Sequence, residues 1–341
     1  MARLVVTGGM GFIGSCFARR RLKTGRDDVI VVDKLTYAGN PNNLKEYKGD
    51  RHLTFLKGDV CDRALMDRVT KDADAVVHFA AETHVDRSIL DAGTFVQTDV
   101  VGTFSVLEAC RKADIDRMVH ISTDEVYGEA EGSPCTEEAP LKPKSPYAAS
   151  KAGADRLAFS YFATYGLPVV ISRCTNNYGP YQHPEKLIPL FVTNAIEDEP
   201  LPMYGSGTNS RDWIHVEDHC AALDRLLAAK GVDGEVFNIG ASEERDVRTI
   251  GRAILDQLGK SPALLQGVAD RPGHVVRHAV DWAKIRTRLG WSPTRSFEAG
   301  LRATVDWYRT NEWWWRPLRS ADARGGKAVR RAAPHSARPR R

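Results

Sequence analysis

The feature that most constrains the fold of this 341-residue chain is a series of short apolar segments separated by segments of helical periodicity. The apolar segments are rich in Val and Ile, and they are RLVVT (3–7), DVIVVD (28–33), HLTFLKGD (52–59), DAVVHFAA (74–81), RMVHIST (117–123) and PVVISRC (168–174). Helical spacing occurs in GTFSVLEACRKA (102–113) and ASKAGADRLAFSYFATYG (149–166). Continuously apolar strands that alternate with helices are typical of a parallel sheet covered on both faces. We therefore expect an α/β fold with a doubly wound parallel sheet of the Rossmann type.

The second half of the chain follows a different pattern. After residue 175 the sequence is irregular and rich in Pro and Gly, with VFNIG (236–240) as one late strand. We expect a Rossmann-type domain over residues 1–175, joined by returning segments near 212–240. A smaller, interleaved C-terminal lobe would comprise residues 176–211 and 241–315.

The last 26 residues, 316–341, contain nine Lys and Arg and one acid, a net charge of +8 in a chain whose total is +4. The rest of the chain therefore carries −4. This segment is rich in Ala, Arg, Gly and Pro and has no apolar periodicity, so we expect a disordered basic tail. We expect no membrane partner and, despite the tail, no nucleic acid.

Cysteine usage and the N-terminus indicate the compartment. The six cysteines form no C-x-x-C pair and no metal-ligand spacing, so we expect reduced thiols, no metal and a cytoplasmic location. The first apolar stretch is only LVV and runs directly into glycines, unlike a signal peptide. No window approaches the roughly 18 apolar residues of a membrane span.

A glycine-rich loop follows the first predicted strand. In VVTGGMGFIGS (5–15), Gly8, Gly11 and Gly14 have the spacing G-x-x-G-x-x-G before a predicted helix. Such glycines permit a tight turn and close approach of a pyrophosphate to the helix N-terminus. The second strand ends at Asp33, nineteen residues after Gly14, where a carboxylate can accept hydrogen bonds from an adenosine ribose and repel a 2′-phosphate. The pattern predicts NAD rather than NADP.

A tyrosine and a lysine lie four residues apart in KSPYAASK (144–151). Ser145 can cap a helix and Pro146 suits its first position, so Tyr147 and Lys151 should share one helix face. An ammonium beside a phenol favours the phenolate, and we expect Lys151 to lower the pKa of Tyr147. Such a tyrosine can remove a hydroxyl proton while NAD accepts a hydride.

Two adjacent carboxylates end the apolar strand in VHISTDEVYG (119–128). Asp124 and Glu125 follow Thr123, and neighbouring acids repel each other and are costly to bury. A solvated loop, a metal site and a pair of proton-transfer groups are all compatible with the pair. No clustered His or Cys accompanies it, which disfavours a metal.

Seven motifs, in order between residue 1 and about 315, resemble the extended short-chain dehydrogenases/reductases and, more narrowly, the dTDP-glucose 4,6-dehydratases. They are TGGMGFIGS, DKLTYAGN, HFAAETHVDRSI, STDEVYG, PYAASK, RCTNNYGPYQHPEKLIPLF and DRPGH. The resemblance implies an NAD-dependent lyase that converts dTDP-glucose to dTDP-4-keto-6-deoxyglucose in deoxysugar biosynthesis. It also implies a homodimer, paired through the helices that carry Phe95, Val101 and Leu107, and Tyr147, Leu157 and Phe162.

The resemblance assigns catalytic roles. Tyr147, assisted by Lys151, would deprotonate the C4 hydroxyl, while Thr123 polarises the C4 oxygen. Oxidation at C4 makes the C5 proton acidic; Glu125 would remove it, and Asp124 would protonate the departing C6 hydroxyl. Burial and the adjacent carboxylate should raise the pKa of Asp124, as an acid requires.

Ligand contacts are implied in the same way. In addition to the three loop glycines, the residues expected around NAD are Phe12, Ile13, Asp33, Lys34, Thr36, Asp59, Val60, Ala80, Ala81, Glu82, Thr98, Tyr147, Lys151 and Asn177. Those expected to contact the substrate are His84, Thr123, Asn176, Lys186, Leu187, Pro202, Tyr204, Arg211, Arg271 and His274. The cationic members of this set suit a diphosphate.

Three sites depart from the family pattern. Asp99 replaces an Asn, Val247 stands where we expect a nucleoside-contacting Asn, and after DRPGH the family's Asp and Arg-Tyr are Val275 and Arg277-His278. The last two sites leave the preference for the nucleotide base open.

Two other functions remain open. A nucleotide-sugar 4-epimerase or decarboxylase could share the fold, although epimerases usually place small residues where Asp124 and Glu125 stand. The second alternative is a non-catalytic NAD-binding scaffold with a nucleic-acid-binding tail.

The aromatic run EWWW (312–315) closes the last predicted helix, and we expect its side chains to pack within the protein rather than to stack on a ligand.

Overall fold

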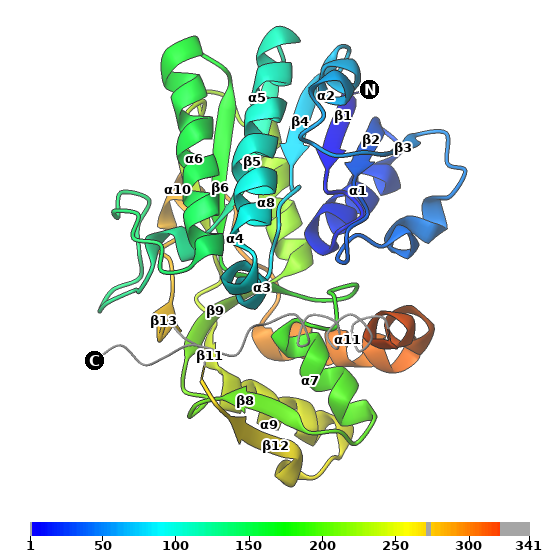
Figure 1. Cartoon of the computed structure of the whole chain (residues 1–341), viewed down its shortest axis with the longest axis vertical. Helices are drawn as coiled ribbons and strands as arrows, with labels where there is room; N and C mark the ends of the chain where they lie inside the picture. Colours follow the sequence, from blue (N-terminus) through cyan, green and yellow to red (C-terminus); the bar gives the residue numbers. More distant parts are fainter. Residues whose placement is uncertain (1, 271–273, 321–341) are drawn as a thin grey trace.

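The computed structural model describes residues 2–270 and 274–320, and its larger lobe is built on a seven-stranded parallel sheet (Figure 1). The spatial order is β3-β2-β1-β4-β5-β6-β10, with the order reversing between β1 and β4. The bounds are β1 (Ala2–Thr7), β2 (Asp27–Asp33), β3 (Leu53–Lys57), β4 (Ala75–His78), β5 (Arg117–Thr123), β6 (Val169–Cys174) and β10 (Val236–Ile239). This order, extended by β10, is that of the Rossmann fold. The predicted doubly wound sheet is confirmed.

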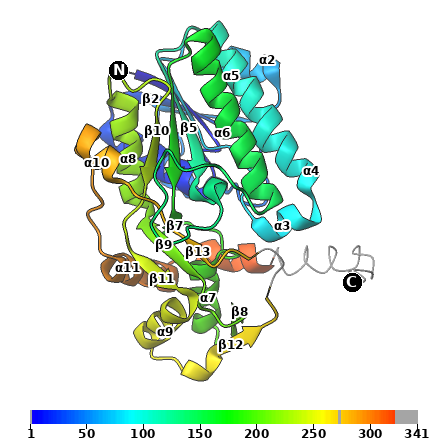
Figure 2. The same cartoon turned by 90° about the vertical axis from the view of Figure 1, so that its left-hand side faces the viewer.

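Helices cover both faces of this sheet, as Figure 2 shows from the side. One face packs against α1 (Phe12–Thr24), α8 (Val216–Ala228) and α10 (Ala283–Leu289), and the other against α2 (Arg63–Thr70), α5 (Gly102–Lys112) and α6 (Pro146–Tyr165). Burial on both faces explains why the strands are apolar without alternation: all seven residues of β5 are buried.

Short helices lie in the connections that follow the carboxyl ends of the strands. They are η1 (Pro41–Tyr47), α3 (Val85–Leu90), α4 (Ala92–Phe95) and η3 (Asp124–Tyr127). A π-helical stretch, η2 (Val96–Val101), runs directly into α5. At the start of α6, the Ser145 side chain accepts a hydrogen bond from Ala148 N at 3.1 Å and Pro146 holds the first position, as the sequence predicted.

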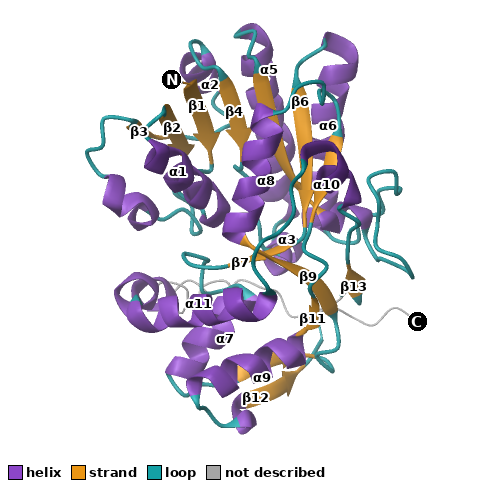
Figure 3. Ribbon diagram, turned by 180° about the vertical axis from the view of Figure 1, so that it is seen from behind, coloured by secondary structure: helices purple, strands orange, loops and turns teal. Residues whose placement is uncertain are grey.

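The smaller lobe lies below the large sheet, as the view from behind shows (Figure 3). It contains a four-stranded sheet made of β7 (Asn176–Tyr178), β9 (Ser210–His215), β11 (Glu244–Asp246) and β13 (Arg277–His278), and a pair, β8 (Leu201–Tyr204) with β12 (Leu265–Val268). Its helices are α7 (Leu187–Ile196), α9 (Val247–Leu258), η4 (Pro262–Leu264) and α11 (Phe297–Thr310), followed by helical residues 312–320. These helices, η4 included, share one apolar core with β7, β8, β9 and β12.

The lobes interleave further than the sequence indicated. Residues 241–315 were expected to form part of the substrate lobe, but α10 lies against the large sheet, where Ile285 and Trp291 are buried in its core. The reason is that β10 lies at the open edge of that sheet, and α10 packs against it.

The predicted start of the basic tail, residue 316, lies too early. Residues 316–320 continue a helix, in which Arg319 forms ion pairs with Glu197 (2.7 Å) and Glu199 (2.6 Å) and Leu318 packs against the lobe core. Acidic side chains at the end of α7 provide the partners that composition alone does not show. The remaining predicted tail, residues 321–341, lies outside the described residues.

No helix in the described ranges combines the length and the apolar character that crossing a membrane requires.

Candidate active site

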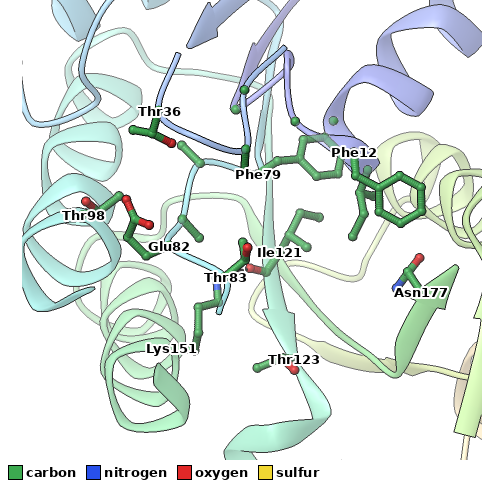
Figure 4. Close-up of a pocket in the computed structure, with 18 of the residues that line it drawn as sticks. Phe12, Thr36, Phe79, Glu82, Thr83, Thr98, Ile121, Thr123, Lys151 and Asn177 are labelled. Carbon is green, nitrogen blue, oxygen red and sulfur yellow. Dashed lines mark hydrogen bonds between the residues drawn. The ribbon is translucent and has the colours of Figure 1, made fainter. Parts of the chain in front are cut away.

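A cavity opens where β1, β2, β4, β5 and β6 end, and the segment from Asn176 to Lys186 closes it from the other lobe (Figure 4). In an open α/β sheet this edge, at the reversal of strand order, is the usual place for a ligand. Side chains from widely separated segments surround the space, among them Phe12, Thr36, Glu82, Lys151 and Asn177.

The glycine loop has the shape that a pyrophosphate requires. Gly8 has a φ of 68°, and a Cβ there would come within 2.7 Å of Ala80 N. A Cβ at Gly14 would come within 2.4 Å of the Gly8 carbonyl oxygen. Gly11, the residue before α1, offers no side chain to cap the first helical N–H groups, which can therefore donate to phosphate oxygens. This loop fits a dinucleotide.

Carboxylates lie at the end of the cavity expected to hold adenosine. Asp33 accepts hydrogen bonds from Met10 N at 2.9 Å and Leu35 N at 2.8 Å, and burial raises its pKa. Lys34 forms an ion pair with Asp59 at 2.6 Å. Every cofactor position expected from the sequence, the three glycines included, lines this one cavity.

The five expected catalytic residues also meet there. Thr123 ends β5, Asp124 and Glu125 begin η3, and Tyr147 and Lys151 lie on the first turns of α6. The chain folds this way locally because the Thr123 side chain caps η3, accepting from Glu125 N at 3.2 Å. The short cap turns the chain at once after the strand and leaves both carboxylates at the cavity wall.

The two adjacent acids do not share one environment. Asp124 is 3% exposed, and burial, followed by the nearby charge of Glu125, raises its pKa to about 8. Its Oδ1 accepts from the Thr123 hydroxyl at 3.2 Å, and within residues 2–270 and 274–320 its Oδ2 has no hydrogen-bond partner. This pKa favours the protonated carboxyl at neutral pH, and its upward direction is the one that the sequence predicted. A solvated loop does not describe it.

The predicted lowering of the pKa of Tyr147 is not found in this structure. Burial, and then Glu125 and Asp99, raise the pKa of Tyr147 well above its usual value, whereas a hydrogen bond with Thr123 acts in the opposite direction. Burial lowers the pKa of Lys151, and its Nζ donates to the Ile121 carbonyl at 2.6 Å. Spacing placed the two side chains correctly but could not give the burial that determines the pKa.

The expected substrate residues divide into groups. Thr123, Asn176 and Lys186 line the main cavity, and Lys186 Nζ donates to the Thr83 carbonyl. Arg211 lines a second cavity together with Glu125, which borders both spaces. The Arg211 guanidinium donates to the Val275 carbonyl at 2.9 Å.

The other expected substrate residues lie outside both cavities. Tyr204 donates to Asp86 at 3.4 Å and meets the His274 ring edge-on, with ring centroids 6.3 Å apart. Pro202 lies near it on β8, Leu187 begins α7, and His84 precedes α3. Arg271 lies outside the described residues.

Several residues that line the main cavity were not expected from the sequence: Phe79, Thr83, Ile121, Ser122, Cys174, Thr175, Gln182, His183 and Glu185. Gln182, His183 and Glu185 belong to the long motif RCTNNYGPYQHPEKLIPLF, so their position there was a usable signal. Ile121 is an ordinary strand residue, and only the sheet register brings it to the cavity, whereas Cys174 and Thr175 belong to the same long motif.

Comparison with known proteins identifies the family. The family model described as GDP-mannose 4,6 dehydratase matches residues 5–304. A dTDP-glucose 4,6-dehydratase from Streptomyces niveus is 49% identical over 329 residues, covering 95% of this chain and 98% of the relative. The chain belongs to this dehydratase family.

Solved structures agree with the dehydratase assignment. DesIV, a dTDP-glucose 4,6-dehydratase from Streptomyces venezuelae solved with NAD and TYD bound, has 51% sequence identity and a TM-score of 0.91, covering 93% of this chain and 99% of that one. A UDP-glucose 4-epimerase from Thermus thermophilus, solved with NAD, shares the fold with a TM-score of 0.84 but only 31% identity, covering 91% of this chain and 99% of that one. The fold is thus common to both activities, and the residues at the site must distinguish them.

Proposed function

We propose that this dehydratase is an NAD-dependent hydro-lyase that converts dTDP-glucose to dTDP-4-keto-6-deoxyglucose, a step in deoxysugar biosynthesis. The observation that carries the proposal is the buried carboxyl of Asp124, whose pKa is raised to about 8, adjacent to Glu125 at the wall of the cavity. A 4-epimerase expels no hydroxyl from C6 and needs no such acid. The high identity to dehydratases supports the same choice.

When bound, NAD supplies the acceptor for the C4 hydride, the donor of that hydride to C6, and a positively charged nicotinamide ring. The glycine loop would hold its pyrophosphate, Asp33 and Asp59 its adenosine, and Lys151 its nicotinamide ribose. The steric limits at Gly8 and Gly14 support this placement of the pyrophosphate.

In the first step Tyr147 takes the proton of the C4 hydroxyl, and the Thr123 hydroxyl donates to the C4 oxygen. Because burial and carboxylates raise the pKa of Tyr147, the phenolate needs a positive charge nearby. Lys151, fixed by the Ile121 carbonyl, supplies one such charge from within the cavity wall.

In the elimination step Glu125 removes the C5 proton, which the neighbouring C4 ketone makes acidic. Asp124 gives its proton to the C6 hydroxyl, the C6–O bond breaks and water leaves. Environments that separate the pKa values of two neighbouring carboxyls are the usual way to obtain an acid and a base from one residue type.

The nucleotide would extend from Glu125 towards the smaller lobe. We assign Lys186 and Arg211 to the diphosphate, because each borders one of the two cavities that meet at Glu125. Asn176 would contact the sugar, and His84, Leu187, Pro202, Tyr204, Arg271 and His274 would complete the nucleotide site.

A homodimer and a cytoplasmic location belong to the same proposal. Phe95 and Leu107, expected at the dimer surface, are buried in the subunit, but Val96, Val101 and Phe159 are 51%, 38% and 38% exposed on η2 and α6. Exposed apolar side chains on adjacent helices favour pairing with a second copy. The cytoplasm is supported by six cysteines that are all free.

The test is to incubate the protein with dTDP-, UDP- and GDP-glucose and a catalytic amount of NAD, and to follow the alkaline absorbance of a 4-keto product. We expect product from dTDP-glucose without net NADH, because the hydride returns to the substrate. Accumulation of NADH in step with product would indicate an ordinary dehydrogenase instead.

A further inference from the structure

The glycine loop is fixed by a side chain from outside the nucleotide-binding motif. The Met10 carbonyl, at the middle of the loop, accepts from Asn43 Nδ2 at 2.9 Å and from Asn40 N at 2.9 Å. Asn43 lies in η1 and is 2% exposed. A buried side-chain amide therefore restrains the loop on which the pyrophosphate would rest.

The C-terminal helical segment, residues 312–320, determines how this amide is oriented. Trp314 Nε1 donates to Asn43 Oδ1 at 2.9 Å, and Trp314 is also 2% exposed. An indole N–H can only donate, so it must meet the oxygen of the amide and leave the NH₂ group for Met10. Two residues 271 positions apart are thus joined in a directed chain of hydrogen bonds that ends at the glycine loop.

The same part of the chain also contacts the opposite wall of the cavity. Trp315 Nε1 donates to the Tyr308 carbonyl at 2.8 Å, and the Tyr308 hydroxyl donates to the Gln182 carbonyl. Gln182 Nε2 in turn donates to the Asn177 carbonyl at 2.9 Å. Gln182 and Asn177 line the cavity, so the aromatic segment is connected to both of its sides.

The segment itself is anchored to the smaller lobe. Arg319 pairs with Glu197 and Glu199 at the end of α7, and Trp314 packs edge-on against Tyr181 with ring centroids 5.6 Å apart. Figure 1 shows this last described helix beside α11. Its position relative to the glycine loop is therefore set by the smaller lobe.

We propose that Trp314 is a positioning residue for NAD: through Asn43 it holds the glycine loop in the shape that retains the dinucleotide during turnover. The inference rests on the proposed function, because a reaction that returns its hydride requires the same NAD molecule to stay bound through the cycle. The aromatic run, expected to serve packing alone, then also serves the cofactor site.

The test compares two tryptophan variants of the full chain. Trp314→Phe keeps a buried ring and removes the N–H, which leaves Asn43 Oδ1 without its donor. We expect the Kd for NAD to rise roughly tenfold, because a loop no longer held by Asn43 spends less time in the shape that binds the dinucleotide. The matched control is Trp313→Phe, at a position that is 49% exposed and whose indole donates to the nearby Asn311. It should bind NAD as the parent does.

NAD affinity is measured by calorimetric titration of protein stripped of NAD, together with the NAD content after gel filtration. Turnover of Trp314→Phe at saturating NAD should return to near the parent value. Unchanged affinity in Trp314→Phe, or an equal loss in both variants, would overturn the inference. A parent protein that binds no NAD would instead overturn the proposed function.

A second variant keeps the test decisive if Trp314→Phe does not fold. Asn43→Asp retains an acceptor for Trp314 but replaces the NH₂ group that donates to Met10 with an oxygen. We expect weaker NAD binding with the indole contact intact. Parent-like NAD affinity in Asn43→Asp would also reject the proposed role.

Discussion

At the scale of single residues, the chemistry depends on Asp124 and Glu125 having different surroundings although they are neighbours in the chain. Asp124 is buried in the wall of the main cavity, where its pKa rises to about 8, whereas Glu125 borders both cavities. The turn made by the Thr123 cap produces this difference. A base at Glu125 and an acid at Asp124 can therefore face adjacent carbons of one substrate.

Replacing the base should separate the two halves of the reaction. Glu125→Gln keeps size and polarity but cannot accept the C5 proton, so oxidation at C4 should persist while elimination falls by roughly 10²–10⁴-fold. Bound NADH should accumulate on mixing with dTDP-glucose, and exchange of the C5 hydrogen with solvent deuterium should nearly vanish. Tyr147→Phe is the matched control, in which bound NAD stays oxidised. Turnover of Glu125→Gln at the parent rate would exclude Glu125 as the base.

Burial of Asp124 also predicts a pH-dependent stability. A carboxyl whose pKa is raised in the folded state, here to about 8 from an unfolded value near 3.9, favours folding below the unfolded pKa. That contribution is lost progressively as the pH rises from about 4 through about 8. The melting temperature of the parent should therefore fall relative to Asp124→Asn between pH 5 and pH 9. Parallel curves for the two proteins would contradict the raised pKa.

Sequence reasoning succeeded for residues whose spacing determines their position, and failed where burial or long-range contact determines their behaviour. Tyr147 and Lys151 share a helix turn, so their joint arrival in the cavity was predictable. The pKa of Tyr147 depends on Glu125 and Asp99 as well as on burial, and none of these follows from spacing. The contact of Trp314 with Asn43 was equally inaccessible, because no local pattern links them.

At the scale of elements, η2, the segment after β4 and α6 are connected by Asp99, a residue that departs from the family pattern. Asp99, 1% exposed on η2, accepts from Glu82 N at 2.9 Å and from the Ser150 hydroxyl at 2.6 Å. Asp99 thus connects the Glu82 segment, which lines the main cavity, to α6, the helix that carries Tyr147 and Lys151. Burial raises the pKa of Asp99, and the charge of Lys151 acts against this.

Asp99→Asn should preserve the connection between the Glu82 segment and α6 while removing the negative charge of the carboxylate. The amide oxygen can still accept from Glu82 N, and Ser150 retains its bond to the Tyr147 carbonyl at 2.8 Å. Because Asp99 raises the pKa of Tyr147, its removal should shift the rise of C4 oxidation rate with pH towards lower pH. The measurement is the pH profile of bound NADH formation in single turnover. Asp67→Asn, on the exposed side of α2, should leave the profile in place. A shift to higher pH would mean that loss of charge on Lys151 dominates.

At the scale of the whole molecule, the two lobes are assembled by chain segments that cross between them. Residues 216–240 (α8 and β10) pack on the large sheet, and residues 244–268 belong to the smaller lobe. α10 then returns to the large sheet, and the final helix packs on the smaller lobe. The strand and helix order of the first 175 residues was predictable because each apolar segment is a local signal. The later crossings were not, because α10 and residues 316–320 owe their positions to partners far away in the sequence.

Two truncations distinguish the part of the C-terminus that stabilises the protein from the part that does not. Deleting residues 321–341 should leave melting temperature and turnover unchanged, since their composition cannot form a packed core. Deleting residues 318–341 also removes Leu318 from the lobe core and the ion pairs of Arg319 with Glu197 and Glu199. A loss of about 1 kcal/mol there would lower the melting temperature by roughly 2–4 °C in a scanning calorimeter. Equal stability of the two truncated proteins would show that the last helical turn contributes nothing. A salt-sensitive association with DNA that disappears with residues 321–341 would instead assign the basic segment to nucleic-acid binding.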